Sequence, residues 1–448
     1  MLDYRFIVEN LAAVKKNIAD RYMQADAEAV VRLFTRRTEL STALQALQQQ
    51  RNANAAVMKG KMEAAERVTL IEEGKKLKET ITAAETELKA VEAELEKEAL
   101  KIPNIAHPDV PIGKEDKDNL EVKRVGEPSK FDFEPLDHVK LGQNLDIVDF
   151  DTATKVSGIK FYYLKNEGVF LELALVRYAL DILQKKGFTP FITPDVAREE
   201  ILEGIGFNPR GAESNVYNLE GEGTCLVGTA EITLGGYFSN TIIPREKLPQ
   251  RMAGLSHCFR REAGAAGQFS KGLYRVHQFT KVEMFVCCLP EESDRFHEEL
   301  RSIEEEIFSG LEIPFRVVDT CTGDLGAPAY RKWDLEAWMP GRTSLPTLET
   351  SPQADGGFPG PVGASRSGGD WGEVTSTSNC TDYQARRLNV RYKDIDGKNK
   401  FVHMLNGTAI AVSRAIIAIL ENFQKSDGSV RLPKVLVPYC GFESIKRN

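Results

Sequence analysis

The hydrophobic positions of the chain follow one regular pattern before a proline-containing stretch at residues 101–119 and a different one after it. Residues 27–100 contain no proline and are rich in Ala, Glu, Lys, Gln and Leu, a composition typical of helices. In the second half of this segment, apolar and small residues alternate in steps of four and three, at Leu70, Gly74, Leu77, Ile81, Ala84, Leu88, Val91 and Leu95. A weaker series runs through the first half, at Val30, Leu33, Leu40, Leu44, Leu47 and Met58. This spacing predicts two helices that each carry one narrow apolar seam.

Gly60 and a cluster of charges lie between the two seams, where the chain can reverse. We therefore expect residues 27–100 to form a long antiparallel hairpin of two helices. The first helix is cationic and the returning helix is dominated by glutamate; residues 28–61 contain only Glu28 and Glu39 against Arg32, Arg36, Arg37, Arg51, Lys59 and Lys61. This imbalance predicts one basic face, although an ordinary solvated helix surface or a dimerising coiled coil explains the same pattern.

Beyond residue 119 the hydrophobic pattern changes to short strand-like runs that alternate with helical stretches. We expect strands at 161–164, 226–227, 282–286, 316–318 and 401–405, and helices at 171–185, 291–308 and 410–423. Such alternation indicates a mixed α/β or α+β domain, and periodicity does not separate the two. Residues 101–119 are interpreted as a linker, so the expected domains are 1–110 and 111–448. Residues 343–370 are rich in Gly, Pro and Ser, which predicts a flexible loop that extends into solvent.

Composition narrows the possible functions. With 448 residues, 42% of them apolar, the chain can bury more than one core. Its formal net charge of −8 gives no global attraction to polyanions, so any nucleic-acid contact requires a local basic surface. The seven cysteines and six histidines show no zinc-ligand spacing, and no long apolar run predicts a membrane span. We expect a reducing compartment, either the cytoplasm or, for a processed organellar form, the mitochondrial matrix or chloroplast stroma.

The stretch FRREAGAAGQF at 259–269 carries the first candidate chemistry. Arg260 follows a strand-like run, Glu262 comes two residues later, and small residues follow that leave room for a ligand. The next stretch, 272–285, reads as a returning strand that bears Arg275, His277, Phe279 and Glu283. The chain has no P-loop and no dinucleotide fingerprint, so a nucleotide would have to be bound by arginines, which form bidentate hydrogen bonds with phosphate or carboxylate. A purely structural hairpin held by ion pairs is equally compatible with these residues.

Four segments taken together resemble the class II aminoacyl-tRNA synthetases. Residues 259–285 resemble motif 2, and HMLNGTAIAVSRAIIAILENFQ at 403–424 resembles motif 3, in which a strand leads into a helix that carries Arg414. LVGTAEI at 226–232 and GEVTSTSNCTDYQARRLNVRY at 372–392 narrow the resemblance to the bacterial and organellar seryl-tRNA synthetases. The resemblance spans nearly the whole chain. It implies an α+β fold with a class II antiparallel sheet flanked by helices, and an N-terminal coiled-coil arm that holds tRNA.

The resemblance also implies the roles of individual residues. For L-serine it implies Thr229, Ala230, Glu231, Arg260, Glu283, Asn406 and Thr408. For ATP it implies Arg260, Arg261, Glu262, Arg275, Val276, His277, Gln278, Phe279, Glu373, Val374, Thr375, Ser376 and Arg414, with Glu373 and Ser376 also at Mg²⁺. Arg260 and Arg414 are the implied catalytic residues, and Arg32, Arg36, Arg37 and Arg51 the expected tRNA contacts. By its position in a strand, His277 is more simply read as a structural, hydrogen-bonded residue.

The implied reaction joins L-serine to the 3′ end of tRNA(Ser), and of tRNA(Sec) where that tRNA exists, through a seryl-adenylate formed from ATP. Two other functions remain open: amino-acid activation for a carrier protein, and a catalytically silent RNA-binding paralogue. Pro194 matches the motif 1 proline of a homodimer interface, although a strand-terminating proline explains it equally well. The chain departs from the family pattern at Gly228, where proline is common, and at residues 343–370, where the family has only a few residues.

Overall fold

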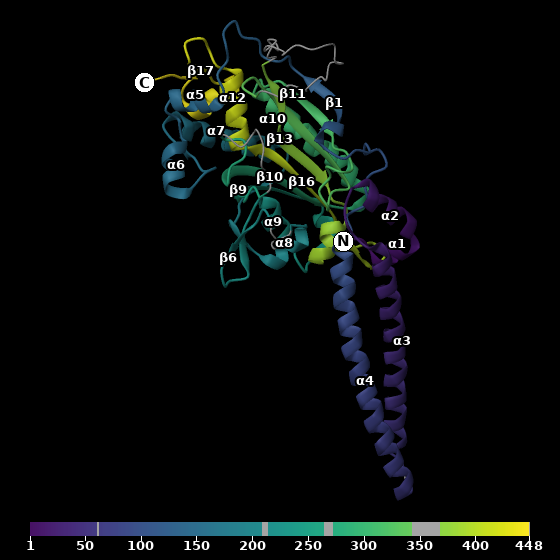
Figure 1. The fold of residues 1–448 in the computed structure, drawn as a ribbon. Coiled ribbons are helices and arrows are strands. Elements are labelled where there is room, and N and C mark those ends of the chain that lie inside the picture. Colours follow the sequence, from purple (N-terminus) through teal and green to yellow (C-terminus); the bar gives the residue numbers. More distant parts are fainter. Residues whose placement is uncertain (61, 208–213, 264–271, 343–367, 448) are drawn as a thin grey trace, which may run out of the picture. The chain divides into compact units, whose positions relative to one another are not determined.

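The fold was analysed in a computed structural model that describes residues 1–60, 62–207, 214–263, 272–342 and 368–447. The chain forms two compact units, Met1–Ala106 and His107–Asn448 (Figure 1). The predicted loop at 343–370 and the small-residue loop after Glu262 lie almost wholly outside the described residues.

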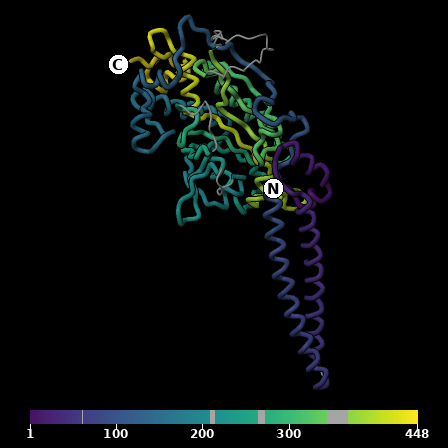
Figure 2. Tube along the Cα trace, viewed as in Figure 1, coloured from purple at the N-terminus to yellow at the C-terminus, as the bar shows by residue number. Residues whose placement is uncertain are grey.

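The first unit consists of four helices, α1 (Tyr4–Glu9), α2 (Leu11–Asp20), α3 (Ala27–Val57) and α4 (Ala64–Ala99). The long helices α3 and α4 run side by side and antiparallel, which confirms the predicted hairpin (Figure 2). The Asp26 carboxylate caps α3 by accepting a hydrogen bond from the Ala29 amide at 2.9 Å. The seam positions Val30, Leu40, Ile81 and Leu95 are buried. Apolar residues that recur every 3.5 positions in the sequence are therefore the ones that the two helices of the arm bury.

The charges of the arm are less one-sided than the sequence suggests. Arg36 forms an ion pair with Glu87 on the opposite helix at 2.5 Å, and Arg37 forms one with Glu92 at 3.1 Å. The glutamates of the returning helix thus lie beside the arginines of the first, so the predicted basic face is partly neutralised. A local count of charges cannot show this because it contains no information about which residues face each other across the hairpin.

The second unit is built around an eight-stranded sheet with the order β1-β11-β12-β13-β16-β10-β9-β4. All neighbouring strands are antiparallel except β4 and β9, which are parallel. Their bounds are β1 Leu120–Val125, β11 Phe315–Asp319, β12 Arg331–Met339, β13 Asp370–Asn379, β16 His403–Ala411, β10 Gln278–Cys288, β9 Gln250–Phe259 and β4 Thr189–Ile192. The antiparallel sheet confirms the α+β class, which the periodicity of the sequence left open.

Helices cover both faces of this sheet. The larger core lies under α7 (Glu167–Lys185), α10 (Ser293–Gly310) and α12 (Val412–Asn422), and the smaller one under α8 (Glu199–Ile205), α9 (Ala230–Gly236) and α11 (Tyr383–Leu388). Alternate residues of a strand point to opposite faces. In β10, Val282, Met284 and Val286 accordingly enter the larger core, whereas Phe285 and Cys287 enter the smaller one.

Shorter elements complete the second unit. The helices are α5 His138–Asn144, α6 Phe150–Ser157 and α13 Val437–Cys440, with single turns at Asp116–Asp118, Arg245–Lys247, Pro290–Glu292 and Lys434–Leu436. The strands are β2 Val148–Asp149, β3 Tyr163–Leu164, β5 Val196–Arg198, β6 Tyr217–Leu219, β7 Thr224–Leu226, β8 Ile242–Pro244, β14 Arg391–Lys393, β15 Asn399–Phe401, β17 Val430–Arg431 and β18 Ser444–Ile445. Among the described helices none is both long and apolar enough to cross a bilayer.

Three local predictions need correction. The returning strand begins at Gln278 rather than near residue 272, because the His277 amide donates to the Lys160 carbonyl instead of joining the sheet. The strand expected at 401–405 is divided at Val402 between β15 and β16. The stretch 101–119 is not a free linker, since the Gly113 amide donates to the Thr322 hydroxyl at 3.3 Å.

Candidate functional site

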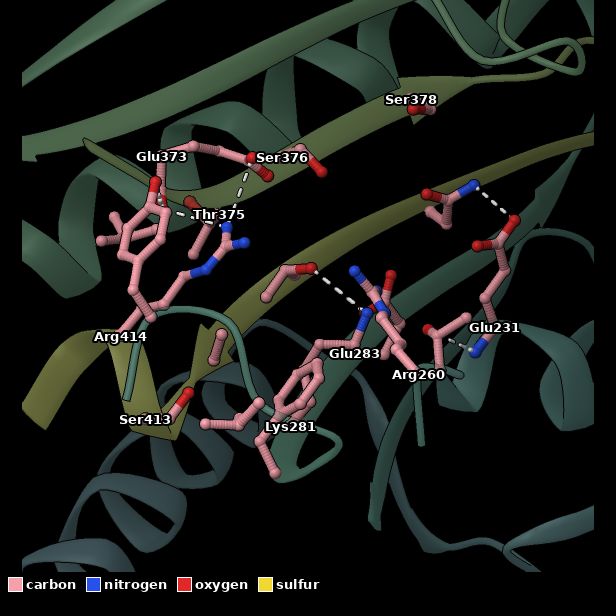
Figure 3. A pocket seen from close by; sticks show the side chains of 18 of the residues that line it. Glu231, Arg260, Lys281, Glu283, Glu373, Thr375, Ser376, Ser378, Ser413 and Arg414 are labelled. Atoms are coloured by element: carbon pink, nitrogen blue, oxygen red, sulfur yellow. Dashed lines mark hydrogen bonds and ion pairs between the residues drawn. The ribbon is translucent and has the colours of Figure 1, made fainter. Parts of the chain in front are cut away.

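A polar pocket opens on the face of the sheet that carries α9. Figure 3 shows Glu373 and Arg414 at one end of it and Glu231 at the other, with Arg260, Lys281 and Glu283 between them. The complete lining comprises Phe207, Thr229, Glu231, Arg260, Glu262, Tyr274, Val276, Phe279, Lys281, Glu283, Glu373, Val374, Thr375, Ser376, Ser378, Asn406, Thr408, Ala411, Ser413 and Arg414.

The floor of the pocket is formed by alternate residues of two neighbouring strands. Phe279, Lys281 and Glu283 are spaced by two along β10 and therefore share one face. Glu283 pairs across the strands with Thr408 of β16, whose hydroxyl donates to Glu283 Oε2 at 3.3 Å. The strand period thus places a carboxylate and a hydroxyl side by side.

A β-bulge keeps apolar side chains of β16 out of this floor. The pairing shifts by one residue, so that Val282 lies opposite Ile410 whereas Glu283 lies opposite Thr408. The extra residue is Ala409, and both Ala409 and Ile410 enter the larger core. Without the bulge Ile410 would share a face with Thr408 and point into the pocket.

Glu231 closes one end of the pocket from the first turn of α9. Its Oε1 accepts hydrogen bonds from Gln384 Nε2 at 2.8 Å and from Asn406 Nδ2 at 2.9 Å. Burial, reinforced by the nearby charge of Glu283, raises the pKa of Glu231 to about 7. A carboxylate held this way gains most from a ligand that brings a positive charge.

Gly254 of β9 allows α9 to approach the sheet. A side-chain carbon at this position would lie 2.8 Å from Ala230 Cβ and 2.9 Å from Leu234 Cδ1, closer than packed carbon atoms allow. Glycine therefore places the helix that carries Glu231 directly against β9.

Arg414 and Glu373 form the other end of the pocket. Arg414 Nη1 donates to the Glu373 carbonyl at 3.0 Å and lies 3.3 Å from its carboxylate. Burial opposes ionisation of this carboxyl, yet the Arg414 guanidinium beside it holds the pKa of Glu373 below its ordinary value. The ring of Tyr274 lies under the Arg414 guanidinium, 4.7 Å from ring centre to Cζ, and the Tyr274 hydroxyl donates to the same Glu373 carbonyl at 3.2 Å.

Arg260 lies at the centre of the pocket, one residue after the end of β9. Its Nε donates to the Gly228 carbonyl at 3.3 Å, and its Cζ lies 5.4 Å from the centre of the Phe279 ring. The chain turns sharply just beyond, where Glu262 has a positive φ of 49°. Glu262 Oε2 forms an ion pair with Arg275 Nη1 at 3.4 Å.

Fourteen of the serine and ATP positions implied by the resemblance line this one pocket. Five do not: Ala230 is buried in the smaller core, Arg261, Arg275 and Gln278 are exposed, and His277 Nδ1 donates to the Arg260 carbonyl at 2.8 Å. His277 also lies before β10 and not in a strand, which corrects that interpretation while leaving its structural role intact.

Sequence reasoning missed six lining residues, Phe207, Tyr274, Lys281, Ser378, Ala411 and Ser413. Lys281 could have been found, because it lies midway between Phe279 and Glu283 on the same strand face. Phe207 carried no such signal, since only the tertiary fold brings it to the pocket.

The donors at one end of the pocket suit a hard cation. Glu373 and Ser376 offer a carboxylate and a hydroxyl, which are oxygen ligands of the kind that Mg²⁺ prefers. Among the described residues no group of three or more His, Cys, Asp and Glu side chains could hold a metal by itself. Glu373 and Ser376 would therefore supply only part of the oxygen ligands that Mg²⁺ requires.

The antiparallel sheet, with a polar pocket between a strand hairpin and the start of α12, is the arrangement of class II synthetases. The family model for the tRNA synthetase class II core domain (G, H, P, S and T) matches residues 216–423, which include all but one residue of the pocket lining. The model for the Seryl-tRNA synthetase N-terminal domain matches residues 1–106, the whole of the first unit.

Whole-chain relatives make the assignment more specific. A serine–tRNA ligase from Treponema denticola is 66% identical over 99% of this chain and 100% of its own length, and one from Treponema pallidum is 57% identical over 99% and 98%. The crystal structure of seryl-tRNA synthetase from Pyrococcus horikoshii complexed with ATP superimposes with a TM-score of 0.88 at 39% identity, covering 100% of both chains. The chain belongs to the seryl-tRNA synthetase family.

Proposed function

We propose that this protein is a serine–tRNA ligase that activates L-serine with ATP and transfers it to tRNA(Ser). The observation that carries the proposal is the convergence of Arg260 from the strand hairpin and Arg414 from α12, 154 residues apart in the chain, on one pocket that ends in Glu231. Guanidinium groups at one end and in the middle suit phosphate and carboxylate, and a carboxylate at the other end suits an ammonium group.

Serine occupies the end of the pocket that carries Glu231. Thr229 and Glu231 bind its α-ammonium group, and Arg260 binds its carboxylate. Glu283 and Thr408 bind its hydroxyl, which has buried polar partners there because these residues are only 2% and 7% exposed. Asn406 orients Glu231 through the 2.9 Å hydrogen bond between them.

ATP occupies the end that carries Arg414. Phe279 stacks on the adenine and Glu262 contacts it, while Arg414 and Arg275 bind the β- and γ-phosphates. The position of Arg275 supports this less directly, since the residue is exposed and paired with Glu262. Arg261, Val276, His277, Gln278, Val374 and Thr375 complete the proposed ATP site. Glu373 and Ser376 would hold Mg²⁺, which when bound neutralises part of the triphosphate charge.

Activation needs no side-chain nucleophile. The serine carboxylate attacks the α-phosphorus of ATP, the bond to the β-phosphate oxygen breaks, and pyrophosphate leaves as seryl-adenylate forms. Arg260 lies between the two ends of the pocket, where it can bind the attacking carboxylate and the α-phosphate together (Figure 3). The residues act by holding the reactants in line and by stabilising the charge that develops on the phosphate.

The helical arm, with Arg32, Arg36, Arg37 and Arg51, is the proposed tRNA contact, and the family resemblance extends the substrate to tRNA(Sec) where it exists. An arm variant tests this contact. Replacing residues 45–81 by a short Gly-rich turn retains the Arg36–Glu87 and Arg37–Glu92 pairs that close the base of the arm. The variant removes Arg51 and the outer part of the arm but keeps Arg32, Arg36 and Arg37. We therefore expect it to keep serine-dependent ATP–pyrophosphate exchange and to transfer serine to tRNA less efficiently.

We further propose that the protein is a homodimer joined through α7 and β4. Phe170 and Leu173 of α7 are 55% and 59% exposed, and Ile192 at the end of β4 is 87% exposed. Exposed apolar residues gathered at the edge of a sheet favour an interface between copies of the chain. The close relatives from Treponema support a cytoplasmic location over an organellar one.

Pyrophosphate exchange and tRNA charging together test the proposed function. The protein should exchange labelled pyrophosphate into ATP only when serine is present, and should then charge tRNA(Ser). Exchange that depends on another amino acid, or none with serine, would contradict the proposal.

A further inference from the structure

Lys281 is a buried cation in the serine end of the pocket to which no role has been given. Its side chain is 6% exposed, and its Nζ forms an ion pair with Glu283 Oε2. The same Nζ donates to Thr408 Oγ1 at 3.4 Å, and the Thr408 hydroxyl donates to Glu283 Oε2 at 3.3 Å. The three side chains therefore form a closed triangle in the floor of the pocket.

The triangle determines which hydrogen-bond donors and acceptors face a ligand hydroxyl in the pocket. A carboxylate offers its oxygens only as hydrogen-bond acceptors, and Glu283 is held in that role by its ion pair with Lys281. Because Lys281 donates to Thr408 Oγ1, the proton of the Thr408 hydroxyl is directed to Glu283 and away from the ligand. A hydroxyl placed between Glu283 and Thr408 therefore meets acceptors and must donate its own proton.

The charge of the whole pocket supports this role. Glu231 and Glu283 are two carboxylates within one enclosed site, and Lys281 and Arg260 are the cations that lower the cost of Glu231's negative charge. Arg260 donates from its Nε to the Gly228 carbonyl and lies over the Phe279 ring, so its contacts in the structure are not with Glu283. Lys281 alone among the described residues forms an ion pair with Glu283.

A lysine with a purely structural role would not need to lie on the pocket face of β10. Lys332 and Asp334 on β12 form a comparable pair at 3.1 Å with side chains 19% and 7% exposed, yet neither lines the pocket. Lys281 instead lies on the pocket face of β10, between Phe279 and Glu283, and its nitrogen contacts the two residues proposed to bind the serine hydroxyl.

We propose that Lys281 is a specificity-determining residue, which acts through Glu283 and Thr408 to make the pocket require a hydrogen-bond donor on the amino-acid side chain. The proposal rests on the proposed serine activation. The side chain of alanine offers no hydrogen-bond donor to the Glu283 carboxylate, whereas the serine hydroxyl does. Without Lys281 the Glu283 carboxylate loses its ion pair and the Thr408 hydroxyl loses the donor that orients it, so both the gain from serine and the penalty on alanine decrease.

A double-mutant cycle separates this role from a structural one. Lys281→Met should lower kcat/KM for serine in pyrophosphate exchange by about 100-fold, mostly through KM, with less than about a threefold change in the KM for ATP. In a Glu283→Gln background the same substitution should lower kcat/KM for serine by less than about a further threefold, because the carboxylate through which Lys281 acts is already absent. Losses that multiply in the double variant would overturn the proposal.

The selectivity for serine over alanine is the second measurement. Lys281→Met should reduce the ratio of the two kcat/KM values by at least about tenfold, whereas Lys281→Arg, which keeps a cation, should retain more of the ratio. Lys332→Met is the matched control, since it breaks a buried lysine pair of the same sheet and should lower the melting temperature without changing the ratio. Equal losses for serine and alanine would overturn the proposal, whereas a wild-type protein without serine-dependent exchange would instead refute the proposed function.

Discussion

The pocket and the helical arm use the same kinds of ion pair in opposite surroundings. Lys281 and Glu283 in the pocket are 6% and 3% exposed, whereas Arg36 and Glu87 on the arm are 50% and 48% exposed. Breaking a buried pair typically costs about 3–5 kcal/mol because a charge is left without a partner, and breaking an exposed pair costs less than about 1 kcal/mol. The pocket charges are therefore fixed in position, while the arm charges can exchange their partners for those of a ligand.

The largest expected effect comes from removing a pocket guanidinium. Arg414→Gln should lower kcat/KM for ATP in serine-dependent exchange by about 10²–10³-fold, since a charged donor to the phosphates is lost. Lys15→Gln, which breaks an exposed pair with Glu28 in the first unit, is the matched control and should leave exchange unchanged. Similar losses in the two variants would contradict the distinction between the charges of the pocket and those of the first unit.

The next effect concerns Glu231 and pH. Its pKa is raised from an ordinary 4.5 to about 7, so between these two pH values the folded protein holds a proton that unfolding releases. The free protein therefore loses stability as pH rises from about 4.5 to about 7. Glu231→Gln removes this loss while its amide oxygen still accepts from Gln384 and Asn406. Thermal unfolding should show the variant more stable at pH 8, by up to about 3 kcal/mol, with little difference at pH 4.

The same protonation of Glu231 should weaken the binding of serine at low pH. Below about pH 7 Glu231 is protonated and cannot pair with the α-ammonium group, so the KM for serine should rise by up to about tenfold for each further pH unit. The KM for ATP measured in the same assays is the internal control. A serine KM that stays flat between pH 5 and pH 7 would exclude this role for Glu231.

A smaller effect is expected on the arm. Neutralising Arg32, Arg36 and Arg37 together should flatten the dependence of tRNA affinity on salt. Arg51 is exposed and forms no ion pair within the part of the chain that the structure describes, whereas Arg36 is held by Glu39 and Glu87. Arg51→Gln should therefore reduce the slope of log affinity against log salt by about 1, and Arg36→Gln by less. If log affinity for tRNA has the same slope against log salt in all variants, these arginines do not contact the tRNA.

The smallest expected effect is on Gly228. Its φ is not positive, and the nearest atom to an added side-chain carbon is the Phe259 carbonyl oxygen at an ordinary 3.6 Å. Gly228→Ala should therefore raise the free energy of unfolding by about 0.4–1 kcal/mol, by restricting the unfolded chain. Chemical denaturation measures this directly. A destabilised variant would mean that the Arg260 contact to the Gly228 carbonyl depends on glycine.

The predicted elements differ in how well the sequence located them. The two arm helices were correct to within a few residues, because their seams repeat over many turns. The strand before Gln278 and the one across Val402 were wrong, because these boundaries depend on hydrogen bonds to Lys160 and to neighbouring strands that are distant in the sequence. The site was found largely by resemblance to a family, and that route passed over Lys281 and Tyr274.

The sequence by itself determined the arm, the alternation of strand faces and the residue types that could bind phosphate and carboxylate, since each depends on neighbours a few positions away. Only the tertiary structure decided which charges face each other. It set Arg36 against Glu87, Arg414 against Glu373, and Lys281 against Glu283 and Thr408. Strand register, one bulge at Ala409 and the antiparallel pairing of two helices fix those partners, and these are properties of contacts between distant parts of the chain.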